Sequence, residues 1–108
     1  MIYRFYYTLI FLTSLIICED KLKQAQVTEF IASETIDYIE SIQSKGDTKK
    51  YLYVRQTNAY LERAKARFIL NKIEGALSDI NITISRDSEL LEAYYYRGQI
   101  YFLQKEYT

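Results

Sequence analysis

The sequence predicts an all-α protein, a short solenoid of antiparallel helical hairpins, and three observations lead to this prediction. Apolar residues recur three and four positions apart along most of the chain, as they do on the buried face of a helix. The 108 residues include no proline and only three glycines, so little interrupts a helix. A stretch that begins at Ala59 returns in register at Ala93, and this interval is typical of stacked helical hairpins. No segment alternates with period two, so no sheet is expected.

Composition narrows the possible functions. Lys plus Arg and Asp plus Glu are equal at 14 each, so no basic field attracts nucleic acid. The chain has no histidine, which removes imidazole bases, histidine metal ligands and Ser-His pairs. No glycine-rich phosphate loop occurs, and the acids Glu34, Asp37 and Glu40 are expected to be solvated on a helix face. We therefore expect no enzyme, no cofactor and no metal.

Residues 1–18 are expected to form a separate targeting segment, an N-terminal signal helix. Arg4 is the only charge before Glu19, and the apolar run between Arg4 and Cys18 has the length of the core of a secretory signal. This charge asymmetry favours export of the chain that follows. We expect a cleaved signal peptide and a mature chain outside the cytosol, in the secretory pathway or endoplasmic reticulum lumen, or in the periplasm or on the surface of a bacterium. The alternatives are an uncleaved anchor, the one route by which the membrane would be contacted, and a buried N-terminal helix.

Cys18 is the only cysteine and allows two interpretations. With the residues before it, Cys18 resembles a bacterial lipobox, although Ile17 stands where that motif has a small residue. In an ordinary signal, cleavage after Cys18 leaves a mature chain without a thiol, so that neither a disulfide nor a metal thiolate is possible. We favour the ordinary signal.

Four helices are expected after a polar lead-in at 19–26, over about 27–45, 49–70, 73–85 and 89–105. The first carries an apolar stripe that consists of Val27, Phe30, Ile31, Tyr38, Ile39 and Ile42. The third has Ile73, Ala76, Leu77, Ile80 and Ile84 on one face. Amphipathic stripes of this kind predict burial against a neighbouring helix.

Turn residues separate the expected helices. Gly46 can take the left-handed conformation after the first helix, and Asp47 or Thr48 can cap the second. A turn is expected at Asn71 and Lys72, and either Asp87 or Ser88 can cap the last helix. A hairpin of the first two of these helices follows from the turn at Gly46.

The internal repeat resembles the tetratricopeptide repeat family over residues 59–108. The matching positions are the first aromatic at Tyr60 and Tyr94, the small residue at Ala64 and Gly98, a second aromatic at Tyr101, the helix B alanine at Ala76, and Tyr107 at the next turn. The resemblance implies that small residues let two helix backbones approach while aromatic rings fill the space beside them. Arg63 and Arg97 also recur, and we expect them to form salt bridges between helices.

The match departs from the family pattern at three positions and is cut short at the last repeat. Arg67 replaces the second aromatic of the first unit, Thr83 replaces an alanine, and Ser88 stands where proline usually closes the unit. The second unit stops at Thr108, before its helix B. An apolar face would be left open, so we expect either a fragment, which we favour, or a layer supplied by another chain.

The resemblance also implies a concave partner-binding face built from the first helix of each unit. We call it the expected concave face, and its residues are Asn58, Leu61, Lys65, Phe68, Glu92, Tyr95, Gln99 and Phe102. Leu61 occupies the site of the first lysine of the clamp with which some family members hold a C-terminal carboxylate, so that clamp is absent. The groove would suit an extended apolar segment or a partner helix, although Phe68 and Phe102 could instead pack on adjacent helices.

The expected function is therefore protein binding, by an exported adaptor whose partner is another protein or peptide. A signal followed by such repeats resembles the lumenal co-chaperones that add a J domain, although a His-Pro-Asp motif is absent here. The alternative is a membrane-anchored or lipidated structural subunit of an envelope complex. Asn81 lies in a glycosylation sequon, which we take as coincidence because it falls inside an expected helix.

Overall fold

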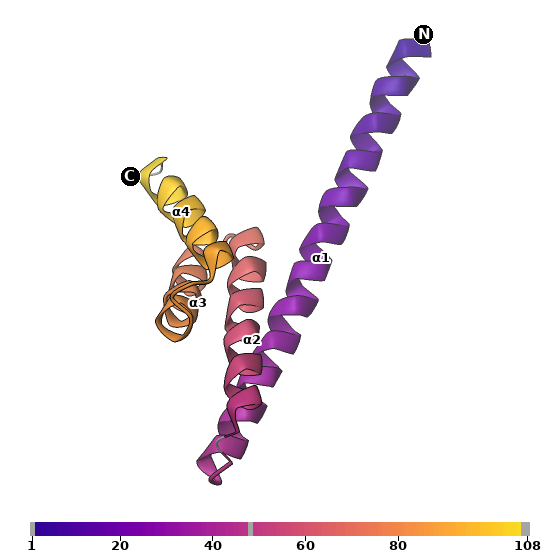
Figure 1. Ribbon diagram of the computed structural model, residues 1–108. Helices are drawn as coiled ribbons and strands as arrows, with labels where there is room; N and C mark the ends of the chain where they lie inside the picture. Colours follow the sequence, from indigo (N-terminus) through magenta and orange to yellow (C-terminus); the bar gives the residue numbers. More distant parts are fainter. Residues whose placement is uncertain (1, 48, 107–108) are drawn as a thin grey trace.

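The computed structural model describes residues 2–47 and 49–106 as four helices joined by short turns (Figure 1). The helices are α1 (Ile2–Ser44), α2 (Lys50–Ile69), α3 (Ile73–Arg86) and α4 (Leu91–Glu106). No strand occurs within these ranges, so the predicted all-α class is confirmed. Thr48 as a cap and Tyr107 as a repeat residue lie outside the described residues, as does Thr108.

The helices pack in sequential order. α1 lies against α2, α2 against α3, and α3 against α4, with a smaller contact between α2 and α4. The result is elongated, with principal extents of 68 × 29 × 22 Å. Each helix therefore depends mainly on its neighbours along the chain.

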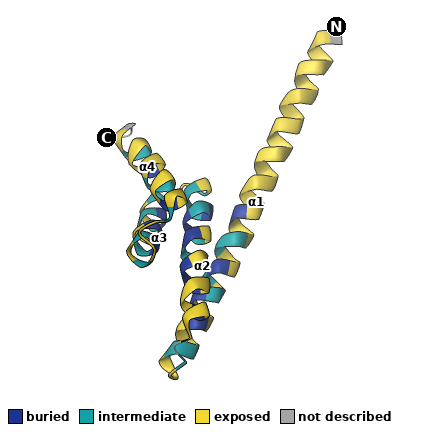
Figure 2. Ribbon diagram, viewed as in Figure 1, coloured by how far each residue is buried: buried dark blue, intermediate teal, exposed yellow. Residues whose placement is uncertain are grey.

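α1 is much longer than expected, because it begins at Ile2 and not near residue 27. Neither glycine nor proline interrupts residues 2–44, and the lead-in consists mostly of good helix formers, so nothing ends the helix there. The first half projects beyond the bundle, and its residues from Tyr3 to Gln24 are exposed, so that Ala25 is the first position described as buried (Figure 2). Within the described chain, no helix combines the length and the apolar character needed to cross a bilayer.

The apolar stripe expected on α1 is buried only in part, because Ile39 is buried while most of its other members are exposed. Val27, Phe30, Ile31 and Tyr38 are each more than half exposed, while Ala32, Ile36 and Ile39 are at most 5% exposed. Ala32 and Ile36 form a core cluster with Ala59 of α2. Small alanine side chains let α2 approach on this side, where Ile36 and Ile39 are buried too, whereas Phe30 and Tyr38 are left in solvent.

The turns agree in part with expectation. Gly46 has φ 96° and Asn71 has φ 60°, the left-handed conformation that Gly and Asn tolerate best. Asp47 does not cap α2; its carboxylate accepts a 3.3 Å hydrogen bond from the backbone N–H of Lys49 within the loop. Asp87 likewise accepts a bond from Glu89 N–H, at 3.2 Å, and α4 begins only at Leu91.

A second core cluster joins the last three helices. Its buried members are Leu61, Ala64, Ile80 and Ala93, from α2, α3 and α4. Ala64 is 1% exposed and Ala76 is completely buried. These two alanines therefore occupy the buried positions where small side chains were expected.

Candidate functional site

The expected concave face divides into buried, paired and exposed residues. Leu61 is 5% exposed and belongs to the core cluster with Ile80 and Ala93. Its assignment to a partner surface is therefore wrong, because α2 turns this side chain inward. Phe68 is half-buried and meets the ring of Tyr96 edge to face at 6.1 Å, so it packs on an adjacent helix.

Lys65 and Glu92 connect α2 to α4. The Lys65 ammonium donates hydrogen bonds of 2.9 Å to both Glu62 and Glu92. Burial works against its charge, but these two bonds outweigh it and raise the pKa of Lys65. The remaining members of the expected concave face are exposed, and they are Asn58, Tyr95, Gln99 and Phe102.

The repeat positions of the second unit do not pack as those of the first do. Gly98 is exposed, and no atom lies within 4 Å of the place where a Cβ would stand. Tyr94 and Tyr101 are 38% and 49% exposed, and the Tyr94 hydroxyl donates to the Ser88 carbonyl oxygen at 2.9 Å. The expected packing role of Gly98 and Tyr101 is therefore not fulfilled, because no described helix covers this side of α4. Tyr60, by contrast, is half-buried and packs against the cluster of Ala32, Ile36 and Ala59.

Asp79 is the centre of an ionic network that joins three helices. It is 1% exposed and accepts two 2.8 Å hydrogen bonds from Arg63 and one of 3.0 Å from Arg67. Arg67 also donates to Glu29 of α1 at 3.3 Å, and Lys72 donates to the same carboxylate at 2.6 Å. The expected helix-to-helix salt bridge of Arg63 is confirmed. Since every charge in this network has a partner, its arrangement suits a structural role.

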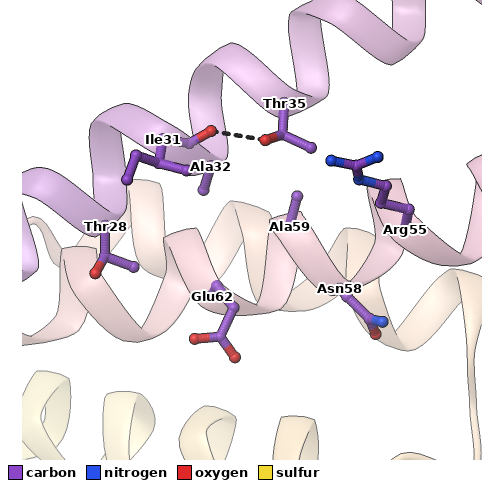
Figure 3. A pocket seen from close by; sticks show the side chains of 8 residues that line it. All are labelled: Thr28, Ile31, Ala32, Thr35, Arg55, Asn58, Ala59 and Glu62. Carbon is purple, nitrogen blue, oxygen red and sulfur yellow. Dashed lines mark hydrogen bonds between the residues drawn. The ribbon is translucent and has the colours of Figure 1, made fainter.

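A hollow of about 280 Å³ opens between α1 and α2 (Figure 3). The residues that line it are Thr28, Ile31, Ala32, Thr35, Arg55, Asn58, Ala59 and Glu62. The Thr35 hydroxyl is already bonded to the Ile31 carbonyl oxygen at 2.8 Å, as the dashed line in Figure 3 shows. Apolar surface thus makes up most of the lining, and Arg55 supplies its cation.

Two further hollows adjoin the first, and all three share Arg55. One of about 560 Å³ includes Tyr51 and Val54 of α2, and one of about 330 Å³ includes Phe30 and Tyr38 of α1. We call this combined surface the Arg55 groove; its lining consists of the eight residues of the first hollow together with Phe30, Glu34, Tyr38, Lys50, Tyr51 and Val54.

The Arg55 guanidinium is free for a ligand. It is exposed, and it forms no hydrogen bond or ion pair with any described residue. Four of the apolar side chains beside it are between 57% and 66% exposed, namely Phe30, Ile31, Tyr38 and Tyr51. An unpaired cation within an exposed apolar surface can attract a ligand that is apolar and carries a carboxylate.

Sequence reasoning identified Asn58 of this groove but missed Arg55. The sequence signal for this groove is the apolar stripe of α1, because Phe30, Ile31 and Tyr38 line the groove. Apolar periodicity alone predicts that these side chains are buried. Among the described residues, no group of three Cys, Asp or Glu side chains is arranged to hold a metal ion.

Comparison with protein-family models, curated proteins and solved structures finds no match to this chain.

Proposed function

We propose that this protein is an exported helical-repeat interaction module, an adaptor that holds a polypeptide segment in the Arg55 groove. The observation that supports this most is the exposed apolar stripe of α1 next to a free guanidinium. Exposed large apolar side chains that gather around a hollow are typical of a binding surface. The ligand would be a segment with apolar side chains and one carboxylate, either acidic or C-terminal.

Shape and charge both favour a polypeptide over a small molecule. The three hollows adjoin one another along α1 and α2, and an elongated groove suits an extended or helical segment. Glu62 lines the same groove but is already paired with Lys65, so it does not occupy Arg55, and Lys50 at the edge of the groove adds a second cation. A carboxylate at Arg55 would be held by charge-assisted hydrogen bonds.

Selection from a displayed random-peptide library tests this function. We expect the full chain to enrich peptides that combine aromatic or aliphatic residues with an acidic residue or a free C-terminus. Arg55→Glu should weaken binding of these peptides about 10-fold or more, because it places a like charge opposite the carboxylate. Lys21→Glu makes the same charge change on the projecting half of α1 and should leave binding intact. Enriched peptides that bind equally well to the Arg55→Glu variant would refute the proposed site.

Export is proposed from residues 1–18, and a lumenal co-chaperone is one form that such an adaptor could take. A second candidate, a membrane-anchored or lipidated structural subunit, is favoured by the exposed apolar half of α1 and the exposed Cys18. The intact mass of the chain recovered from cells separates these. A mass that lacks the segment from Met1 to Cys18 supports the soluble adaptor, a retained N-terminus supports the anchor, and added lipid mass on Cys18 supports the lipoprotein.

A further inference from the structure

The sequence repeat is also a repeat of geometry between α2 and α4. On α2 the Arg63 guanidinium lies over the Tyr60 ring at 5.4 Å, and on α4 the Arg97 guanidinium lies over the Tyr94 ring at 5.2 Å. Each arginine follows its tyrosine by three positions, and the two pairs are separated by the interval of the sequence repeat. Equivalent faces of α2 and α4 therefore carry the same pair of an arginine over a tyrosine ring.

The two equivalent faces differ in what covers them. On α2, Ala64 is 1% exposed and Arg63 makes two hydrogen bonds with the Asp79 carboxylate of α3. On α4, the equivalent Gly98 is exposed, and nothing lies within 4 Å of its Cβ position. Arg97 has only a 3.4 Å bond to the Asn81 amide oxygen and no carboxylate partner among the residues described.

The face of α3 that packs on α2 shows which side chains fit against a surface of this kind. Ala76, Asp79 and Ile80 are 0%, 1% and 0% exposed. They follow the pattern i, i+3, i+4, so they lie on one face of the helix. The alanine permits close approach, the aspartate neutralises Arg63, and the isoleucine fills the adjoining core.

We propose that the α4 face, defined by Tyr94, Arg97, Gly98 and Tyr101, is a second docking surface, which binds a helix of another protein. That helix presents a small residue, an acidic residue and an aliphatic residue at i, i+3 and i+4. The small residue packs on Gly98, and the acidic residue pairs with Arg97. This site is separate from the Arg55 groove and goes beyond the proposed peptide-binding function.

The chemistry of the α4 face excludes a purely apolar partner. Covering Arg97 removes its guanidinium from water, which is costly unless an acidic group replaces the lost hydration. A second copy of this chain does not offer the required helix face, because its Ala76, Asp79 and Ile80 are buried against its own α2. The α3 face of a second copy is therefore not the occupant.

A synthetic helix with the sequence of residues 72–87 is the probe for this surface. It carries the face that already fits α2, and a hydrocarbon staple between positions 81 and 85, which are exposed in α3, removes the cost of helix nucleation. Fluorescence anisotropy with the full chain should show saturable binding. Arg97→Glu in the chain, or Asp79→Lys in the probe, should each weaken binding about 10-fold or more, because like charges then oppose each other.

Combining the two changes is the decisive measurement. The Arg97→Glu chain and the Asp79→Lys probe should recover most of the lost affinity, while Lys21→Glu in the chain, the matched charge change elsewhere, should have no effect. Absence of binding, or binding that is indifferent to Arg97, overturns the proposal. Self-association of the chain that depends on Arg97, measured by sedimentation, also overturns it, since the occupant is then a second copy. The result does not depend on Arg55, so the two proposals fail separately.

Discussion

Asp79 forms ion pairs with Arg63 and Arg67. The packing of α2 on α3 partly shields both guanidinium groups from water. The Asp79 side chain is 2% exposed, and those of Arg63 and Arg67 are 15% and 25% exposed. A buried carboxylate with three charge-assisted hydrogen bonds fixes the relative positions of the two helices. Removing the charge would leave the Arg63 guanidinium without a carboxylate in that space, since Glu29 reaches only Arg67.

We therefore expect Asp79→Asn to lower the free energy of unfolding by about 3 kcal/mol, the cost of breaking a buried ion pair from one side. Urea unfolding followed by circular dichroism measures this. Glu40→Gln is the control, because Glu40 is an exposed acid of α1 without a partner among the described residues, and its loss should change stability by less than about 0.5 kcal/mol. An equal effect of both variants would show that the Asp79 network contributes nothing specific.

Glu29 should make stability depend on acid pH. The hydrogen bond from Lys72, against the opposing effect of burial, lowers the pKa of Glu29 below its ordinary value of 4.5. Because the pKa of Glu29 is lower in the folded chain than in the unfolded chain, its stabilising contribution is complete at pH values above the unfolded-state pKa. The contribution is lost as the pH falls through the folded-state pKa. Glu29→Gln should therefore be less stable than the native chain at pH 7, and the difference should shrink below about pH 4.5. Urea unfolding from pH 7 to pH 3 would contradict this if the difference stayed constant.

At the level of single residues, the sequence predicted the ion pair of Arg63 but not the direction in which the Leu61 side chain points. The Arg63 salt bridge follows from an arginine repeated on a helix beside another amphipathic helix. Leu61 was placed on a partner surface because its repeat position resembles that of a family groove, but its contacts with Ile80 and Ala93 depend on how α2 is rotated about its axis. Arg55 could not be identified, because whether an arginine has a partner depends on side chains from two helices.

At the level of elements, apolar periodicity located the last three helices to within about two residues of their observed bounds. It identified the buried face of α1 only in part, because Ile39 is buried as expected, but Ala25 and Ala32 are buried as well and Phe30 is 66% exposed. Hydrophobicity favours burial of the larger side chain, whereas close helix packing favours the smaller one. In α1 close packing outweighs the burial of Phe30, which is why this large apolar side chain is exposed in the Arg55 groove.

The equivalent positions Ala64 and Gly98 should respond oppositely to larger side chains. Gly98→Ala should stabilise the protein by about 0.5–1 kcal/mol, because alanine is the better helix former and its Cβ meets nothing within 4 Å. Ala64→Leu should destabilise it by about 1–3 kcal/mol, because the site is buried between helices. Thermal unfolding of both variants measures the contrast. A destabilised Gly98→Ala variant would show that the α4 face is already covered in solution.

At the scale of the whole molecule, the four helices pack in sequence, and α2 contacts each of the other three. The interval of the sequence repeat, from Ala59 to Ala93, predicted helices in succession, and the described chain has that order. Membership of the tetratricopeptide family stays a prediction, because the sequential packing of four helices is a coarser property than a repeat fold. Tertiary contact also decides which part of α1 belongs to the bundle, and helix propensity alone does not reveal this.

Deleting residues 1–20 tests where the cooperative unit begins. Every side chain described from Tyr3 to Gln24 is exposed, and the first one that bonds to another helix is Glu29. The shortened chain should therefore keep its Tm within about 3 °C, because little buried surface is lost. Deleting residues 1–33 also removes Glu29 and Ala32, and it should lower the Tm by at least about 10 °C, since both the ionic network and the cluster around Ala59 lose members. A large loss of Tm with the shorter deletion would mean that the projecting half of α1 packs against the bundle in solution, and the exposed apolar surface assigned to it would then be wrong.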